Sequence, residues 1–177
     1  MKRKGFTLVE LLIVIVVIGI LSAMMMLSST EAVTSARASN IVSNLRNLKT
    51  AALSLYTDNL DSADNDGLVA GKVTVSNGIA TVTGSMGQVI KYMNNDDKTA
   101  YANYGITKTT EGWFVYCDSI SDGRVQSKLA GRAKSVGILG ATAATGLAQG
   151  SSNIFKEGNT VAGMWVVKPA VTTAPSN

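Results

Sequence analysis

The chain has 177 residues, enough for one folded domain beside a membrane segment. Its net charge of +4 depends on the three cations of residues 2–4, since the rest of the chain has 13 cations and 12 anions, and this balance gives no general argument for nucleic-acid binding. The sequence has no histidine, which excludes Ser-His and Cys-His catalytic pairs, and its one cysteine excludes an intrachain disulfide. We therefore expect neither an enzyme nor a bound cofactor.

The first 27 residues combine a basic start with a long apolar run that contains one acid, Glu10. Residues 11–30 carry no charge, and a helix of this length rises about 30 Å, the thickness of a bilayer's hydrocarbon core. A carboxylate near the start of the run costs about 2.5–3.5 kcal/mol on insertion, which the aliphatic side chains of residues 11–21 can offset. We expect the segment to insert as a helix whose acid needs a partner.

Two general interpretations explain this segment incompletely. A secretory signal would be cut at a small-residue site near Ser22-Ala23, but the apolar run is long and continues into a second helical pattern. A plain membrane anchor would orient with the cations of residues 2–4 in the cytoplasm, which leaves Glu10 unexplained.

A third interpretation rests on residues 4–21, KGFTLVELLIVIVVIGIL. Gly5 followed by Phe6, then Thr7-Leu8 and Glu10, resembles the N-terminus of type IV prepilins and of the related pseudopilins and competence pilins. The resemblance implies that a membrane aspartyl peptidase, the prepilin peptidase, cuts between Gly5 and Phe6 and N-methylates Phe6. This cut precedes the apolar run, so the hydrophobic helix stays in the mature protein.

The resemblance also implies a role for Glu10 in assembly. The pilus assembly machinery of the membrane would withdraw subunits from the lipid bilayer, and their helices would then pack together in a helical homopolymer. A buried carboxylate needs a cation, and the implied partner of Glu10 is the N-terminal amine of a neighbouring subunit. Glu10 also lies four residues after Phe6, one helical turn away, and an acid there suits the positive end of the helix dipole. The alternative is that Glu10 only reaches the lipid headgroups.

Two features depart from the family's common pattern. Many pilins close a C-terminal disulfide loop, which the single Cys117 cannot form; it lies in the apolar run WFVYC, and we interpret it as a packed core thiol, with reaction between subunits as the alternative. Many pilins also have a proline early in the long helix. Here Gly19 is followed by no proline, so local unwinding near Gly19 is less strongly encoded.

The helical pattern continues to about residue 57. A continuous helix over residues 6–57 would be roughly 78 Å long. Its apolar positions recur at spacings close to three and four, which predicts a face packed on a head domain. These positions are Val33, Ile41, Leu45, Leu48, Ala52 and Leu55.

The acidic stretch DNLDSADNDG, residues 58–67, is predicted to be a solvated connection between this helix and the head. With Gly67 at the glycine position of an EF-hand loop, the last ligand position falls on Val73 instead of glutamate, so we reject that loop. A calcium site of another geometry that uses Asp61, Asp64 and Asp66 is the alternative.

From residue 68 the apolar pattern changes to a period of two, which predicts strands. KVTVSNGIATVT predicts a hairpin that turns at Asn77-Gly78. Ser85 is expected to cap a short helix over residues 87–93, with Gln88 in the reciprocal position of a capping box. Asp122 is expected to cap a second helix over residues 124–136.

The remaining segments complete an α+β pilin fold, in which an antiparallel sheet lies on the upper half of the long helix. We expect a hairpin formed by residues 101–107 and 112–117, a long mobile loop over residues 137–152, and a last hairpin formed by residues 154–156 and 160–168. The predicted divisions of the chain are a leader (1–5), the long helix (6–57), the head (58–168) and a flexible tail (169–177).

Four cations, Arg124, Lys128, Arg132 and Lys134, lie on the second head helix, and the spacing of the first three places them on one face. Because competence pilins contact DNA, a DNA-binding face is one interpretation of these residues. We favour a solvated face or a subunit contact, because the aromatic residues of the strands lack the alternation with basic residues that single-strand binders use.

The expected function is that of a structural subunit of a type IV pilus filament, which serves adhesion, motility or surface attachment. The expected location is the membrane for the single-pass precursor and the cell exterior for the filament. The alternatives are a pseudopilin or competence pilin of a secretion or DNA-uptake machine, and a membrane-anchored binding protein that never polymerises.

Overall fold

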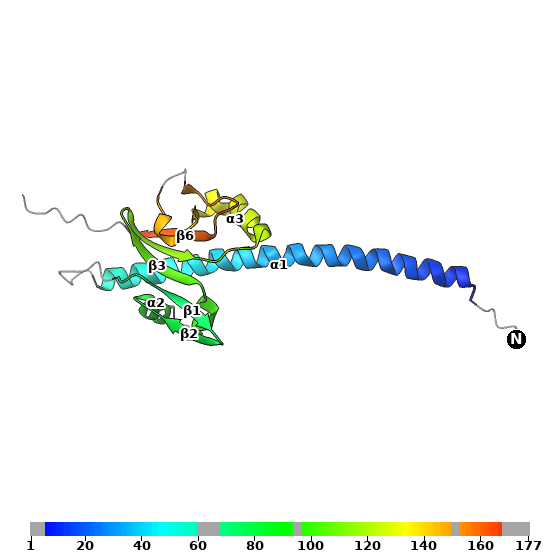
Figure 1. The fold of residues 1–177 in the computed structure, drawn as a ribbon, viewed down its shortest axis with the longest axis horizontal. Helices are drawn as coiled ribbons and strands as arrows, with labels where there is room; N and C mark the ends of the chain where they lie inside the picture. The colour runs from blue at the N-terminus through cyan, green and yellow to red at the C-terminus, as the bar shows by residue number, and fades with distance from the viewer. Residues whose placement is uncertain (1–5, 60–67, 94–96, 150–152, 168–177) are drawn as a thin grey trace, which may run out of the picture.

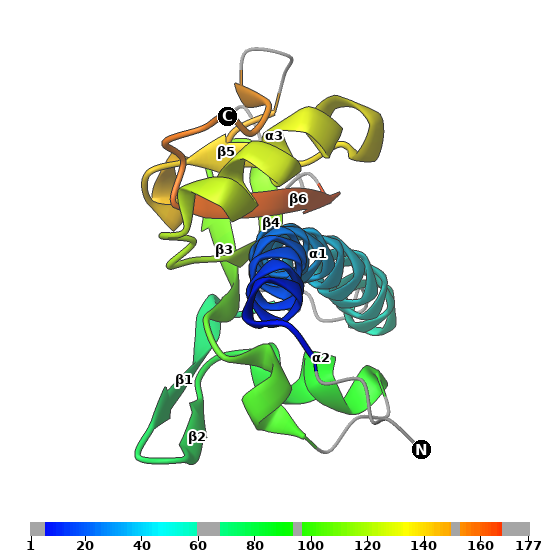
Figure 2. The same ribbon diagram turned by 90° about the vertical axis from the view of Figure 1, so that its right-hand side faces the viewer.

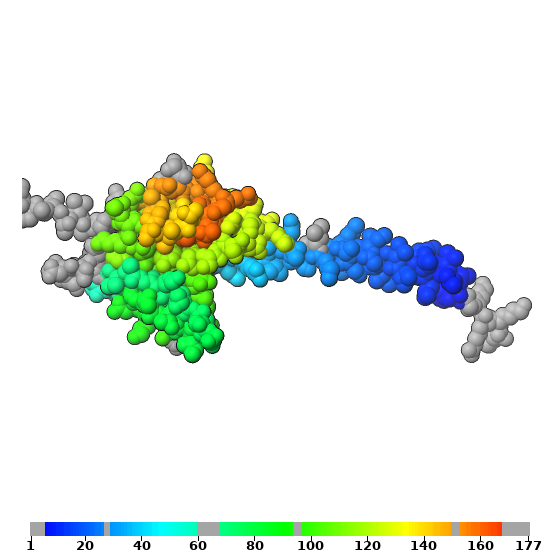
Figure 3. Space-filling view, viewed as in Figure 1, coloured from blue at the N-terminus to red at the C-terminus, as the bar shows by residue number. Residues whose placement is uncertain are grey.

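The computed structural model describes residues 6–59, 68–93, 97–149 and 153–167. One long helix, α1 (Leu8–Asp58), forms the axis of the molecule. The head packs against the C-terminal half of α1, and the N-terminal half projects from it alone (Figure 1). The space-filling view shows the same narrow rod leaving a broad head (Figure 3). At 51 residues, α1 is about 77 Å long.

The head contains a six-stranded sheet in the order β2-β1-β3-β4-β6-β5, with antiparallel pairing throughout. Viewed along the axis of α1, the short helix α2 and the longer helix α3 lie on opposite sides of α1 (Figure 2). This arrangement is the expected α+β fold. In chain order the head elements are β1 (Gly71–Ser76), β2 (Ile79–Val82), α2 (Met86–Tyr92), the 3-10 helix η1 (Lys98–Tyr101), β3 (Tyr104–Thr109), β4 (Gly112–Cys117), α3 (Gly123–Val136), β5 (Leu139–Ala141), the 3-10 helix η2 (Ala144–Gly146) and β6 (Val161–Val167).

The C-terminal half of α1 supplies one wall of the main core. Leu45, Leu48 and Ala52 are fully buried there, as their helical spacing predicts. Val33 was expected on the same face, and that prediction is wrong, because its side chain is 51% exposed. At 3.6 residues per turn, Thr34, not Val33, continues the register of Leu45 and Ala52, and Thr34 is the buried residue.

We expect Leu48→Ala to destabilise the head by about 2–5 kcal/mol, because it leaves a cavity where α1 packs on the sheet. The matched control is Leu53→Ala, the same change on the same helix at a side chain that is 40% exposed. Thermal unfolding of the purified variants, followed by near-ultraviolet circular dichroism, compares the two. Equal shifts in midpoint would contradict the assignment of Leu48 to the core.

The first hairpin and the second head helix follow their sequence signals. β1 and β2 pair up to Ser76 and Ile79, and the two-residue turn between them, Asn77-Gly78, has positive φ angles of 51° and 78°. A type I′ turn requires such angles at both central residues. In α3, the carboxylate of Asp122 accepts a hydrogen bond from the Arg124 N–H at 3.0 Å, which is the expected cap.

The capping box predicted at Ser85 and Gln88 is wrong. α2 starts beside Ser85, but the Ser85 side chain makes no cap hydrogen bond. Its hydroxyl oxygen instead accepts a hydrogen bond from the Val69 N–H at 2.7 Å. Ser85 thus ties the entry of β1 to the start of α2, a long-range contact that a local sequence pattern does not contain.

The predicted start of the second hairpin is also wrong, because residues 98–101 form η1 and β3 begins only at Tyr104. The Asp97 side chain caps η1 by accepting a hydrogen bond from the Thr99 N–H at 3.0 Å. Asn103 then adopts φ 68°, which turns the chain into the strand. An Asn tolerates this left-handed conformation better than most residues do.

The segment expected to be a mobile loop, residues 137–152, contains structure in its described part. β5 pairs with β6 from Leu139 opposite Gly163 to Ala141 opposite Val161. Leu147 is buried against Phe114 and Tyr116 in a second, smaller core. A Cβ on Gly163 would come within 2.7 Å of the Leu147 side chain, so a glycine allows this close packing. The composition of small residues did not predict β5, an edge strand that its pairing with β6 stabilises.

The last predicted hairpin has the right strand and the wrong partner. β6 lies between β4 and β5, and Ile154 makes only an isolated bridge with Leu139. The arm of residues 154–156 is too short to compete with β4, all six residues of which are buried. The predicted tail, residues 169–177, lies outside the described residues.

Candidate processing and assembly site

A hydrogen-bonded cap closes the N-terminus of α1. Thr7 donates to Glu10 Oε2 twice, from its backbone N–H at 2.9 Å and from its hydroxyl at 2.7 Å. The Glu10 N–H donates in return to Thr7 Oγ1 at 3.3 Å. This is a capping box, which satisfies two backbone N–H groups that a helix end otherwise leaves unpaired.

The cap also changes the expected relation between Phe6 and Glu10. Thr7 has an extended backbone, so the helix starts at Leu8 and Phe6 lies before it. The spacing of one helical turn from Phe6 to Glu10 therefore does not apply to this chain. Thr7 was not singled out from the sequence for this role, although the pattern T-x-x-E before an apolar run is the usual signal of a capping box.

Glu10 retains the capacity to bind a further donor. Both hydrogen bonds that the carboxylate accepts from described residues end on Oε2, which leaves Oε1 able to accept another. The carboxylate is exposed, at the end of the helix where its charge suits the helix dipole. It is thus placed to bind a cation that comes from outside the described chain.

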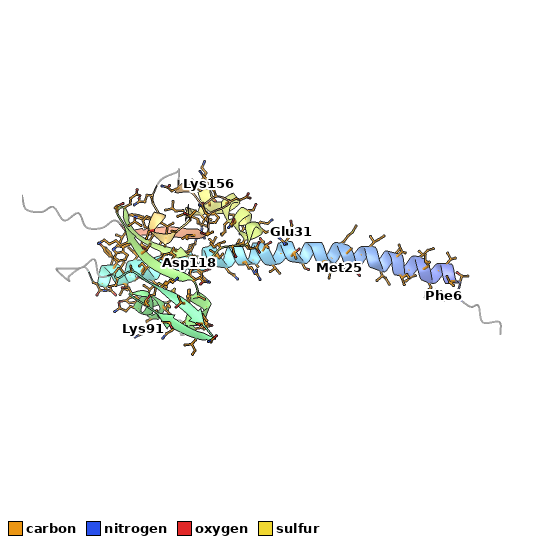
Figure 4. The ribbon with its side chains drawn as sticks, in the orientation of Figure 1. Phe6, Met25, Glu31, Lys91, Asp118 and Lys156 are labelled. Atoms are coloured by element: carbon orange, nitrogen blue, oxygen red, sulfur yellow. The ribbon has the colours of Figure 1, made fainter. Side chains whose placement is uncertain are left out.

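The helix beyond the cap is apolar and uncovered. All the side chains from Phe6 to Met26 are exposed, and Phe6 itself is 83% exposed at the free end of the rod (Figure 4). α1 is long and apolar enough to cross a membrane. Water is an unfavourable solvent for such a surface, so it requires lipid or other apolar helices.

Comparison with protein families decides what this segment is. The family described as the prokaryotic N-terminal methylation motif matches residues 1–26. The chain carries the type IV prepilin signature. No curated protein and no solved structure matches the chain. Pilin-like proteins with this signature are structural subunits and not typically enzymes, and the signature implies processing by a prepilin peptidase.

Of the three residues singled out in the prepilin-like sequence, the structure describes two, Phe6 and Glu10. Phe6 and Glu10 are at the free tip of α1, as just described. Gly5 lies outside the described residues. So do Asp61, Asp64 and Asp66, the alternative calcium ligands; within the described ranges, no group of three or more acidic or sulfur-bearing side chains is arranged to hold a metal ion.

One cation of the basic helix α3, Arg132, forms hydrogen bonds that hold the head together. Arg132 donates from Nη1 to Ser39 Oγ at 2.8 Å and from Nη2 to Ser35 Oγ at 3.5 Å, which joins α3 to α1. Arg124, Lys128 and Lys134 are exposed. The three residues predicted to stack on one face therefore differ in role, and Arg132 is a contact within the subunit.

Cys117 is the packed core thiol that its surroundings in the sequence predict. It is 6% exposed at the end of β4, and burial raises the pKa of the thiol to about 12, against the opposing effect of a hydrogen bond with Tyr104. The Tyr104 hydroxyl also accepts from Asn44 on α1 at 3.3 Å.

We expect Cys117 to resist alkylation by a maleimide at neutral pH until the protein is unfolded. With a pKa of about 12, only about one thiol in a hundred thousand is ionised at pH 7, and the thiolate is the reactive form. A Ser135→Cys variant, with its new thiol exposed on α3, is the control for rapid labelling. Fast labelling of Cys117 in the folded protein would contradict the assignment and favour a thiol that reacts between subunits.

Proposed function

We propose that the protein is a structural subunit of a type IV pilus filament. It enters the membrane as a single-pass precursor, is cut between Gly5 and Phe6, is methylated at Phe6, and polymerises through α1. The head then lies on the outside of an extracellular filament. The filament serves adhesion, motility or surface attachment, and the protein itself has no catalytic role.

The observation that carries this proposal is the contrast between the two halves of α1. The C-terminal half is packed under the head, whereas the segment from Phe6 to Met26 is exposed throughout and, apart from Thr7, Glu10 and Ser22, apolar. A plain anchor would explain the apolar length but not an acid at its tip. Helices that first lie in lipid and then bundle with copies of themselves explain both.

Glu10 and Phe6 would form the contact between subunits. Cleavage gives Phe6 an amine, and an α-amine with a pKa of about 7.7–8.0 is largely cationic at pH 7. In a bundle of apolar helices, that cation and the Glu10 carboxylate would each be costly to bury alone and far less costly as a pair. The exposed carboxylate, with Oε1 able to accept another hydrogen bond, supports this role.

The proposed divisions of the chain follow from this function. Residues 1–5 are the leader, residues 6–57 the membrane-spanning and filament-core helix, residues 58–168 the exposed head, and residues 169–177 a flexible tail. Its partners are copies of itself, the prepilin peptidase, the membrane assembly machinery and, before assembly, the lipid bilayer.

Negative-stain microscopy of sheared cells, together with mass spectrometry of the mature N-terminus, tests the proposal. A long fibre built of chains that begin with methylated Phe6 is the expected result. Processed chains that form only short fibres in the cell envelope would indicate a pseudopilin. Chains that retain Met1 and form no fibre would indicate a membrane-anchored binding protein.

A further inference from the structure

Helix α3 carries four basic residues, and it lies on the side of the head from which the apolar N-terminal half of α1 projects (Figure 1). In α3 the buried face contains Val125, Leu129 and Ala133. The exposed residues include all four cations of the helix, whose sequence has no acid. We call these four cations and the exposed Arg37 of α1 the basic rim: Arg37, Arg124, Lys128, Arg132 and Lys134.

The charges of the basic rim are not balanced within the described part of the head. None of its five cations forms an ion pair with a described residue. Three acids lie near it. Asp118 shares a pocket with Arg37 but forms an ion pair with Lys72, Asp122 caps α3, and Glu31 lies on α1 just before the rim, so the five cations of the rim outnumber the two acids that no ion pair neutralises. A net positive surface is left over.

The place of the basic rim along α1 is fixed by contacts. The two hydrogen bonds from Arg132 hold α3 beside Ser35 and Ser39. Val125 shares a pocket of about 370 Å³ with Arg37 and Ile41 of α1, so the N-terminal end of α3 lies against the same stretch. Figure 4 shows Glu31 on α1 beside the end of α3.

This place corresponds to the headgroup layer of a bilayer. If residues 11–30 fill the hydrocarbon core, Glu31 is the first residue beyond it, and Ser35 lies about 6 Å further along the helix. The polar layer of each leaflet is roughly 5–7 Å thick. The lower part of the basic rim therefore lies at the outer edge of the headgroups, within the Debye length of about 8 Å at physiological salt.

We propose that the basic rim binds the phosphates of anionic phospholipids while the precursor is in the membrane. This inference rests on the membrane-inserted state of the proposed function and adds a lipid-binding surface to the head. Because α1 is one continuous helix, every inserted subunit holds the basic rim at the same height above the bilayer. The head is thereby kept against the membrane surface until the subunit is withdrawn.

Lipid is favoured over DNA as the partner because the covalent link to the inserted helix brings the basic rim to the headgroups without a separate encounter. The rim also has no aromatic side chain on which a base could stack.

The test uses the full-length chain in vesicles, with a fluorophore on a Ser135→Cys thiol in α3 and a spin-labelled lipid headgroup as quencher. Quenching is compared in phosphatidylcholine vesicles with and without phosphatidylglycerol, at low salt and in about 1 M salt, where the Debye length falls to about 3 Å. The variant is Arg124→Gln/Lys128→Gln/Lys134→Gln, which leaves Arg132 in place. The control is Lys91→Gln/Lys98→Gln/Lys156→Gln, which removes three exposed cations elsewhere on the head.

We expect phosphatidylglycerol to increase quenching of the wild-type and control proteins, and high salt to reverse the increase. Each removed charge should weaken docking about fivefold, so the rim variant should lose about a hundredfold in the docking equilibrium. Quenching that is equal in both vesicles, or unchanged in the rim variant, would overturn the proposal. If quenching is equal in both vesicles and a short DNA duplex binds the wild type but not the rim variant, the basic rim is a nucleic-acid surface and the lipid proposal is overturned.

Failure of the proposed function has a different outcome in the same preparation. A chain that alkaline carbonate strips from the vesicles has not inserted its helix, and this would overturn both proposals. A chain that resists carbonate and yet gives no lipid-dependent quenching would overturn the lipid-binding surface alone.

Discussion

A Glu10→Ala precursor is expected to insert and to be cut after Gly5 as efficiently as the wild type, but to yield at least about a hundredfold less filament. Removing one partner of a buried ion pair costs about 3–5 kcal/mol, because the other charge is left without compensation in an apolar bundle. Here that charge is the amine of Phe6. Quantitative immunoblots of the sheared fraction and of the membrane fraction measure assembly and precursor supply separately.

Two further variants separate the charge of Glu10 from its role in the cap. Glu10→Gln keeps the T-x-x-Q form of the capping box but removes the charge, whereas Thr7→Ala keeps the charge and removes the hydroxyl that Glu10 binds. If the charge pairs with an amine, Glu10→Gln fails like Glu10→Ala and Thr7→Ala assembles. The reverse pattern would show that Glu10 only stabilises the helix end.

A Gly5→Ala precursor is expected to remain uncut and to form no filament. By the prepilin resemblance the peptidase requires glycine before the scissile bond, and an added methyl group at that residue would obstruct cleavage. The uncut chain keeps the three cations of residues 2–4 at the tip of α1 and never exposes the Phe6 amine, so packing of the apolar helices would bury unpaired positive charge. Mass spectrometry of the membrane fraction distinguishes a chain that begins with Met1 from one that begins with Phe6.

Gly19→Ala is the matched control for this experiment. The position lies within the same apolar segment, and a Cβ there would meet no other group within 4 Å. Alanine also favours a helix over glycine by about 1 kcal/mol. We expect normal cleavage of Gly19→Ala. Filaments made from Gly5→Ala chains with an intact leader would remove cleavage from the assembly pathway.

Local signals in the sequence were sufficient wherever neighbouring residues determine the structure. The apolar run and its acid predicted the exposed half of α1, the Asn77-Gly78 pair predicted the β1–β2 turn, and Asp122 predicted the start of α3. The candidate site was partly recognised in the same way, through Phe6 and Glu10. Thr7 was missed there, although its spacing from Glu10 carries a local signal.

Predictions failed where the partner lies far away in the chain. Ser85 had the pattern of a helix cap, but the Val69 N–H, sixteen residues earlier, uses its hydroxyl. Residues 137–149 had the composition of a loop, but β6 pairs with Leu139–Ala141 and Leu147 closes a second core. Ile154 lies only seven residues before the start of β6, but β4 offers a longer apolar surface and pairs with β6 instead.

By itself, the sequence determined that this protein is a long helix with an apolar half, a lone acid at its tip and an α+β head, because periodicity, length and charge act over a few residues. Only the tertiary structure decided which strands pair, that Arg132 joins α3 to α1, and that α3 lies beside Ser35–Ile41 of the long helix. Burial of apolar surface selects among many alternative long-range contacts, and that selection depends on the whole chain at once.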